Sequence, residues 1–364
     1  MKRYGNLFDK IINKKNIFDA HNKAKKGKKK YQTVIKFEEK LTDNINKIHD
    51  ILKNKEYKVS EYIIDTRIER GKERIIFKLP YSPDRVIHHC LLQIIEPVLA
   101  KPYIKDTYQS IKGRGIHKAK DRVKMFLTDK PNTQYCLKID IKKFYPSVNN
   151  EILKNLIRKK IKCKDTLWLI DEIIDSTKGL PIGNYTSQTF GNFYLSYFDH
   201  FVKEKLKIKY YVRYADDMVF FSDSKEKLHL IKIEIENYLN KELDLQLKSN
   251  WQIFPTYTRG LDFLGFRFFN RFILIRKSIK KAYCEIIKQK PSIRIMQKFA
   301  SYYGWLIASN SYNLIRKTIS KDLIYEYQKI CDKIKISNPF RKIVLIPKKV
   351  NKYGFYQPNL FNFI

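Results

Sequence analysis

The stretch that most constrains the fold is Lys209–Ser222, in which two adjacent carboxylates, Asp216 and Asp217, stand between two apolar runs. The runs, Tyr210–Tyr214 and Met218–Phe221, are rich in β-prone residues and predict a hairpin with the acids at or beside its turn. Neighbouring side chains in mid-strand point to opposite faces, whereas at a tight turn both acids can line one concave site. Such a pair repels itself unless a cation is present, and Mg²⁺ is commonly held by one or two carboxylates plus substrate phosphates. The alternative is an Asp-Asp turn exposed to water.

A further acid follows another apolar run. Residues 134–140 predict a short buried strand that ends at Asp140, and a turn and then a helix from about Asn149 follow. A carboxylate that emerges at the end of a buried strand needs a partner or a metal ion. The alternative is that Asp140 caps a helix or forms an ordinary salt bridge.

The charge balance indicates a polyanionic partner. The 364 residues include 74 Lys and Arg against 37 Asp and Glu, a formal net charge of +37, and 14% of them are aromatic. A folded protein with that much like charge repels itself, so we expect a polyanion to offset it. Basic residues interleaved with Tyr and Phe suit a phosphate backbone and unstacked bases. An AT-rich genome, which raises Lys, Asn, Ile and Tyr together, would account for part of the same composition.

Other features favour a cytoplasmic protein that does not enter a membrane. No run of about 18 apolar residues occurs, so we expect no transmembrane helix, and the first residues lack the apolar core of a signal peptide. The cysteines lie far apart without a Cys-x-x-Cys pair, which predicts mostly buried, reduced thiols and neither disulfides nor a zinc site. They are Cys90, Cys136, Cys163, Cys284 and Cys331.

Periodicity and turn residues predict a mixed α and β chain. The lysine-dense segment 22–30 is expected to be either a solvated arm or a phosphate contact. His88 and His89 are expected to be ordinary helix residues, because no third metal ligand stands nearby. Helical spacing covers residues 37–52, 84–97 (with Asp84 as N-cap), 186–206, 225–240 and 279–334, the last broken at Pro291 and near Gly304. Strand patterns cover 57–68, 73–79, 243–250, 260–269 and short pieces of the tail.

The motifs occur in an order that resembles a reverse transcriptase. Residues 138–147, Lys-Ile-Asp-Ile-Lys-Lys-Phe-Tyr-Pro-Ser, are similar to the first palm motif of that family. Tyr-Ala-Asp-Asp at 214–217 resembles its catalytic hairpin, and Leu-Asp-Phe-Leu-Gly at 261–265 resembles its primer grip. The resemblance implies an α+β right-hand polymerase. Its expected parts are a basic N-terminal extension (1–45), fingers and palm (46–270), a helical thumb (271–335) and a tail (336–364).

The resemblance also assigns roles to the residues at matching positions. The catalytic acids and ligands of two Mg²⁺ ions, which Mn²⁺ could replace, are expected to be Asp140, Asp216 and Asp217, with the backbone carbonyl of Ile141. Residues expected to bind the dNTP are Arg74, Lys78, Tyr145, Ile182 and Gly183. Residues expected to contact template or primer are Gln188, Tyr214, Leu264 and Gly265.

The loop at 181–188 resembles a narrower branch of the family. Ile-Gly-Asn-x-Thr-Ser-Gln is similar to the reverse transcriptases of diversity-generating retroelements, in which an apolar residue at the position of Ile182 accompanies error-prone copying opposite template adenines. Residues 108–119 and 199–203 also look like that branch. The partners so implied are a structured RNA template, cDNA or an RNA–DNA hybrid, dNTPs and a small basic oligomeric accessory protein. The implied setting is the cytoplasm, with a bacterial or phage origin.

One position departs from the family pattern. Relatives carry a lysine shortly after the strand expected at 243–250, where this chain has Asn250-Trp251, and Lys248 lies two residues earlier. The proton donor to pyrophosphate therefore stays unassigned. The alternatives are an intron-type or phage-defence reverse transcriptase with ordinary or untemplated synthesis, and a non-catalytic RNA-binding protein on a polymerase scaffold. The three intact aspartates argue against the last.

Overall fold

The computed structural model describes residues 2–69 and 71–333. By its internal contacts the chain divides into two compact units. The first comprises Met1–Gly115, Leu137–Phe220 and Glu226–Gln252, and the second comprises Ile116–Cys136, Phe221–Lys225 and the described part of Ile253–Ile364. The expected boundaries of fingers, palm and thumb stay a prediction. Among the described residues, no helix is both long and apolar enough to cross a bilayer.

Four helices open the first unit, and one of them packs on a later helix, α5 (Val86–Leu99). Asn16 Nδ2, from α2, donates to the carbonyl of Cys90 over 3.1 Å, and Gln93 Nε2 donates to Asn16 Oδ1 over 2.8 Å. These bonds fix the N-terminal helices to the rest of the unit. The four are α1 (Phe8–Ile12), α2 (Lys14–Ala24), α3 (Gln32–Glu39) and α4 (Leu41–Lys53).

Two sequence expectations in this region are corrected. The lysine-dense segment 22–30 is not an arm throughout, because its first residues complete α2, in which Ala24 is buried, and the rest forms turns. The single helix expected at 37–52 is two helices, because Lys40 between them has the non-helical angles φ −124° and ψ 47°.

The predicted strand pair near residue 70 is confirmed, with a shorter first strand. β1 (Ile63–Glu69) and β2 (Lys72–Lys78) run antiparallel in the register that pairs Ile63 with Lys78. Asp84, in contrast, does not cap α5. It lies in a preceding turn of π-helix, η1 (Tyr81–Arg85), where its buried Oδ1 accepts hydrogen bonds from the Tyr57 hydroxyl (2.8 Å) and the Ser60 amide (3.1 Å). Helix α5 also continues beyond Pro97 to Leu99.

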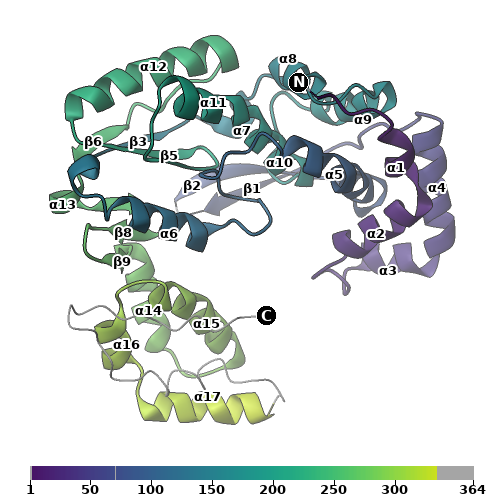
Figure 1. Ribbon diagram of the computed structural model, residues 1–364. Coiled ribbons are helices and arrows are strands. Elements are labelled where there is room, and N and C mark those ends of the chain that lie inside the picture. Colours follow the sequence, from purple (N-terminus) through teal and green to yellow (C-terminus); the bar gives the residue numbers. More distant parts are fainter. Residues whose placement is uncertain (1, 70, 334–364) are drawn as a thin grey trace. The chain divides into compact units, whose positions relative to one another are not determined.

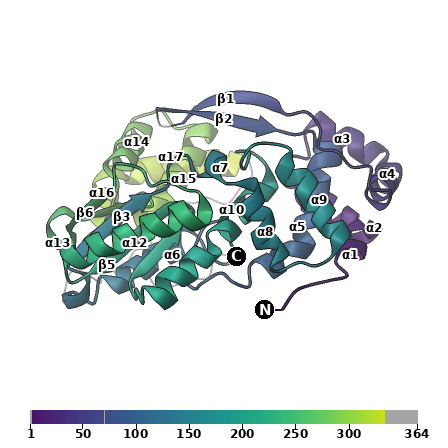
Figure 2. The same cartoon turned by 90° about the horizontal axis from the view of Figure 1, so that it is seen from above.

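The largest sheet among the described residues has four strands in the order β4-β5-β3-β6. Its predicted hairpin is confirmed, since β4 and β5 pair antiparallel with Tyr214 opposite Asp217. The strand that ends at Asp140 is also confirmed, and it lies next to β5. Helices α11 (Ser196–His200) and α12 (Lys225–Leu243) cover one face of the sheet (Figures 1 and 2). The strands are β3 (Tyr135–Asp140), β4 (Tyr211–Tyr214), β5 (Asp217–Ser222) and β6 (Gln252–Pro255).

Helices between β3 and β4 supply much of the aromatic core. Asn149 caps the helix predicted after Asp140, because its side chain accepts hydrogen bonds from the amides of Glu151 and Ile152. The helix expected at 186–206 is confirmed in outline but is divided into three segments, and Phe190, Phe193, Tyr194 and Phe198 on it are buried. The elements are α7 (Phe144–Ser147), α8 (Asn150–Arg158), α9 (Lys164–Asp175), α10 (Tyr185–Tyr194), α11 and η3 (Phe201–Lys205).

The strand predicted at 243–250 is wrong. Helix α12 continues to Leu243, and Asp244 then takes a left-handed φ of 50°. The chain beyond it makes one isolated bridge, between Leu247 and Ile141, and a turn follows before β6 begins. The alternating apolar residues at 243–250 therefore form one bridge to Ile141 and not a strand.

The second unit contains a small antiparallel sheet in the order β7-β8-β9. The predicted pair at 260–269 is confirmed, and the third strand, β9, was not predicted. The helical break at Pro291 is confirmed, whereas α15 runs through Gly304, since one glycine costs a packed helix only about 1 kcal/mol. The tail at 336–364 lies outside the described residues. The elements are α6 (Ile116–Phe126), η2 (Pro131–Thr133), α13 (Thr256–Arg259), β7 (Leu261–Phe263), β8 (Phe266–Phe268), β9 (Ile273–Ile275), α14 (Lys277–Ile287), α15 (Ile293–Ile307), α16 (Tyr312–Thr318) and α17 (Lys321–Lys333).

Candidate active site

The structure brings the three predicted acids to adjoining strand ends. Asp140 is the last residue of β3, and Asp217 is the first residue of β5, the strand beside it. Asp216 lies in the tight turn between β4 and β5, after Ala215, whose φ of 54° is left-handed. Burial raises the pKa of Asp216 to about 7, and the carboxylates of Asp140 and Asp217 add to the rise. The acids therefore share one electrostatic environment.

The two carboxylate oxygens of Asp140 differ in their hydrogen-bond partners. Oδ1 is buried and has no hydrogen-bond partner among the described residues, whereas Oδ2 forms an ion pair with Lys248 Nζ. The backbones are joined as well, because the Lys248 amide donates to the Asp140 carbonyl over 2.9 Å. Lys248 thus lies against a predicted catalytic acid, although its sequence position differs from the family pattern. The neighbouring Ile141 is fully buried, and its role as a carbonyl ligand stays a prediction.

The acids suit a hard divalent cation. The charge of Asp140 helps to raise the pKa of Asp216, because two neighbouring carboxylates repel each other unless one is protonated or a cation lies between them. The unpartnered Oδ1 of Asp140 adds an oxygen ligand. Among the described residues, no group of three or more His, Cys, Asp or Glu side chains is arranged to hold a metal ion. A Mg²⁺ ion at these acids would therefore need further ligands, and Mg²⁺ in proteins commonly takes water and substrate phosphates.

A cavity of about 370 Å³ lies in the first unit. Its wall includes five residues predicted to bind nucleotide or template, namely Arg74, Tyr145, Ile182, Gly183 and Gln188. The remaining lining residues are Arg85, Gln109, Asn184, Tyr185 and Ser187. A cavity of this size with basic, aromatic and amide groups is of the kind that binds a small polar ligand.

Tyr145 connects the cavity to the acids. It lies on α7, which begins shortly after β3, and its ring packs against Gly191, where a Cβ would stand 3.4 Å from the ring. Burial, followed by the charge of Asp216, raises the pKa of Tyr145 to about 12. The charge of Asp216 therefore acts on the hydroxyl group of Tyr145, a residue that lines the cavity.

Ile182 and Gly183 are held against the β1–β2 hairpin. The Phe77 amide, on β2, donates to the Ile182 carbonyl over 2.8 Å. Gly183 has a φ of 124°, and a Cβ there would stand 2.3 Å from the Phe77 carbonyl oxygen. Only glycine allows this close approach of two backbones. The loop thus places Ile182 in the cavity wall by backbone contacts.

Other predicted residues lie outside the cavity wall. Lys78 forms an ion pair with Asp65 across the hairpin at 2.6 Å. Tyr214 ends β4 beside the acidic turn. Leu264 and Gly265 form the β7–β8 turn of the second unit, where a Cβ on Gly265 would stand 2.5 Å from the Trp305 ring. Their roles toward nucleotide, template and primer stay predictions.

Several cavity residues were not predicted to form the site. Gln109 has a φ of 73°, a backbone state that its residue type does not reveal. Tyr185 occupies a variable position of the loop motif, and its ring stacks on His89 at 4.0 Å between centroids. His88 and His89 are buried residues of α5, as expected, but the expectation that their rings are satisfied is wrong, because His88 Nε2 and both ring nitrogens of His89 have no hydrogen-bond partner among the described residues. Burial lowers the pKa of His89 to about 3. Asn184 and Ser187 did carry a sequence signal, because they belong to the loop motif at 181–188, and Arg85 is a basic residue in the expected fingers.

Comparisons with known proteins bear on the family and the fold of the chain. A family model described as reverse transcriptase (RNA-dependent DNA polymerase) matches residues 51–268. Protein YkfC of Escherichia coli (strain K12) is 22% identical over 58% of this chain and 66% of its own length. The structure of apo telomerase from Candida tropicalis matches with a TM-score of 0.51 and 15% identity, over 79% of this chain and 58% of that one. Telomerase from Candida albicans with a TWJ fragment of telomeric RNA matches with a TM-score of 0.47 and 12% identity, over 78% and 56%.

The chain spans 66% of the bacterial relative and under three fifths of either telomerase chain. The likeness to the apo telomerase shows the fold, a mixture of helices and antiparallel sheets of the right-hand polymerase kind. The family model covers more than half of the chain. The chain therefore belongs to the reverse transcriptase family of RNA-dependent DNA polymerases.

Proposed function

We propose that this chain makes cDNA from an RNA template by nucleotidyl transfer. The observation that carries the proposal is the connection through Tyr145, which lines the cavity and lies within the field of Asp216. A nucleotide bound in that cavity would lie beside the acids that are suited to hold metal. The family model that covers residues 51–268 supports the same activity.

In this proposal the primer 3′-hydroxyl attacks the α-phosphorus of a dNTP, and pyrophosphate leaves. Asp140 and Asp216, with Asp217 as the third acid, would hold two Mg²⁺ ions, which supply Lewis-acid activation of the hydroxyl and charge compensation for the leaving group. Arg74 in the cavity wall would pair with the triphosphate, since a planar guanidinium binds phosphate through two hydrogen bonds. The ring of Tyr145 would exclude a ribose 2′-hydroxyl. Gln188, Tyr214, Leu264 and Gly265 remain the proposed contacts to template and primer.

The first test is primer extension by Asp216→Asn on a defined RNA template with Mg²⁺ and dNTPs. We expect synthesis to fall by at least about 10³-fold while the fold is retained, because one metal ligand is lost. The control is Asp43→Asn, which removes an exposed carboxylate on α4 and should leave the rate unchanged. Full activity of Asp216→Asn would refute the metal assignment.

We further propose that the polymerase serves a diversity-generating retroelement and copies template adenines with errors. Ile182 supports this, because its apolar side chain in the cavity wall cannot hydrogen-bond the sugar or base as a glutamine amide can. Polar contacts discriminate between substrates more strongly than an apolar surface does. A structured RNA, the cDNA and a small basic accessory protein would be the partners, in the cytoplasm of a bacterium or of a phage-infected cell.

The fidelity proposal is tested by sequencing the products of Ile182→Gln at every template position. We expect errors opposite template adenines to fall by about tenfold relative to wild type, because a polar contact is added. Ile182→Leu, which keeps an apolar side chain of similar volume, should keep the wild-type error rate. An unchanged error rate in Ile182→Gln would exclude Ile182 as the cause, and uniformly accurate wild-type cDNA would point to an intron-type or defence enzyme.

A further inference from the structure

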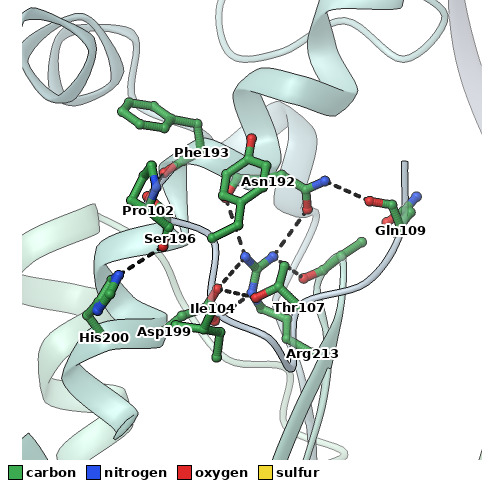
Figure 3. Close-up of polar contacts among 12 residues, drawn as sticks. Pro102, Ile104, Thr107, Gln109, Asn192, Phe193, Ser196, Asp199, His200 and Arg213 are labelled. Carbon is green, nitrogen blue, oxygen red and sulfur yellow. Dashed lines mark hydrogen bonds and ion pairs between the residues drawn. The ribbon is translucent and has the colours of Figure 1, made fainter. Parts of the chain in front are cut away.

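A buried ion pair lies beneath the acidic turn. Arg213, on β4, and Asp199, on α11, both have fully buried side chains, and Nη2 of Arg213 stands 2.6 Å from Oδ2 of Asp199. The Arg213 Nε group also donates to Asp199 Oδ1 over 2.7 Å. The Asp199 carboxylate receives two more hydrogen bonds, from the Tyr211 hydroxyl (2.8 Å) and the Thr107 hydroxyl (2.7 Å). Figure 3 labels Asp199, Arg213 and Thr107 of this cluster, in which each carboxylate oxygen of Asp199 accepts two hydrogen bonds.

The guanidinium has donors left over, and one of them holds the acidic turn. Arg213 Nη1 donates to the carbonyl of Ala215 over 3.0 Å. That carbonyl belongs to the peptide bond that joins Ala215 to Asp216. Ala215 has a left-handed φ of 54°, a conformation that alanine adopts only when its surroundings impose it. Arg213 therefore holds the backbone that aims the Asp216 carboxylate.

Its other donors extend toward the cavity. Arg213 Nη1 and Nη2 donate to the side-chain and backbone oxygens of Asn192, over 3.4 and 3.3 Å. The Asn192 amide nitrogen in turn donates to the carbonyl of Gln109 over 2.9 Å, and Figure 3 shows it pointing at that residue. Gln109 has a left-handed φ of 73° and lines the cavity.

All five N–H donors of Arg213 are thus engaged, on Asp199, Asn192 and Ala215. Lysine at this position would keep the charge but has a compact ammonium with three donors and no planar fork. The ion pair alone requires only two of the guanidinium donors. Of the remaining three, one holds the strained backbone at Ala215, and two hold Asn192, which in turn contacts the left-handed Gln109 at the cavity wall.

We propose that Arg213 is a positioning residue that sets the metal-binding turn and, through Asn192, the wall of the nucleotide cavity. The proposal rests on the proposed polymerase function. It assigns to the buried ion pair a role in catalysis that ordinary core packing does not have. Loss of the planar guanidinium of Arg213 should therefore lower the affinity for metal and the turnover rate. These losses should be larger than the accompanying loss of folding stability explains.

The test compares Arg213→Lys with Tyr211→Phe. Both variants disturb the hydrogen bonds of the Asp199 carboxylate, but Tyr211→Phe leaves the contact of Arg213 with Ala215 in place. Arg213→Lys should lower the melting temperature more than Tyr211→Phe, since it removes more hydrogen bonds, so both variants are assayed at a temperature at which each is fully folded. In Arg213→Lys we expect the Kd for Mn²⁺, measured by electron paramagnetic resonance, to rise at least tenfold and kcat for primer extension to fall at least 100-fold. In Tyr211→Phe both quantities should stay within about twofold of wild type.

A second variant, Asn192→Ala, tests the arm toward the cavity and keeps the proposal testable if Arg213→Lys does not fold. We expect its KM for dNTP to rise about tenfold, because the Gln109 carbonyl loses the hydrogen bond from Asn192. The affinity for Mn²⁺ should stay unchanged, because the hydrogen bond from Arg213 to the Ala215 carbonyl remains. Equal losses in Arg213→Lys and Tyr211→Phe, or a wild-type KM in Asn192→Ala, would reduce the cluster to ordinary packing and overturn the proposal.

The two levels of the proposal fail in different ways. A wild-type chain that binds Mn²⁺ but extends no primer on any template refutes the polymerase function, while the Mn²⁺ titrations of Arg213→Lys and Tyr211→Phe still decide the positioning role. A wild-type chain that does not bind Mn²⁺, with Asp216→Asn as the reference for lost binding, refutes both.

Discussion

Among single residues, Asp216 gives the metal-free protein a pH-dependent stability. Burial, and then the carboxylates of Asp140 and Asp217, raise the pKa of Asp216 from 3.8 to about 7. The unfolded chain releases this proton near pH 4. Between about pH 4 and pH 7 the folded state therefore binds a proton that the unfolded state has lost, and the protein becomes less stable as the pH rises through this window. The rise in pKa corresponds to about 4 kcal/mol.

The measurement is the melting temperature of metal-free wild type and Asp216→Asn between about pH 4 and pH 8. Asparagine carries no charge, so the variant should gain stability relative to wild type as the pH rises and should be the more stable protein at pH 7. Added Mg²⁺ should stabilise wild type at pH 7 and have a smaller effect on the variant, because ligand binding favours the folded state. A difference between the two proteins that does not vary with pH would contradict the assignment.

At the scale of elements, the loop before α10 depends on one glycine. In Gly183→Ala the new Cβ would meet the Phe77 carbonyl at 2.3 Å, in a backbone conformation with a φ of 124°. The loop must then move away from β2, and we expect a loss of about 1–3 kcal/mol of stability together with a raised KM for dNTP. Denaturant unfolding and steady-state primer extension measure the two effects.

Gly304→Ala is the matched control for that variant. Gly304 lies inside α15, and a Cβ built there meets nothing within 4 Å. Alanine is the better helix former by about 1 kcal/mol, so this variant should be as stable as wild type or more so, with unchanged KM. A similar loss in both variants would show that the loop geometry is not the cause.

The elements that the sequence predicted are those with a local signal. The β4–β5 hairpin and the strand that ends at Asp140 were predictable because apolar runs and turn residues mark them directly. The strand expected at 243–250 failed because alternation does not reveal whether a partner strand pairs beyond one residue, here Leu247 with Ile141. Gln109 and Arg213 were not recognised as parts of the site, since their importance comes from contacts with residues far away in sequence.

For the whole molecule, the net charge of +37 predicts binding of nucleic acid that depends strongly on salt. Each phosphate that the protein neutralises on a single strand contributes about −0.7 to the slope of log K against log salt concentration. With about four such contacts, the affinity for unstructured RNA should fall roughly 50-fold between about 50 and 200 mM salt. Fluorescence anisotropy with a labelled RNA measures the slope. A flat response would show that the charge is not used for binding RNA.

The neighbourhood of β3 and β5 also has a kinetic consequence. The acids at 140 and 216 come together only when two strands that are distant in sequence lie side by side. Bringing the two ends of a long chain segment together costs conformational entropy before the new contacts stabilise the fold. Folding therefore slows as the contacts join residues farther apart in sequence. A nascent chain thus lacks the proposed metal site until the segment between these strands has been made and both strands have paired. The proposed polymerase could begin to copy RNA only after its own synthesis has passed that point.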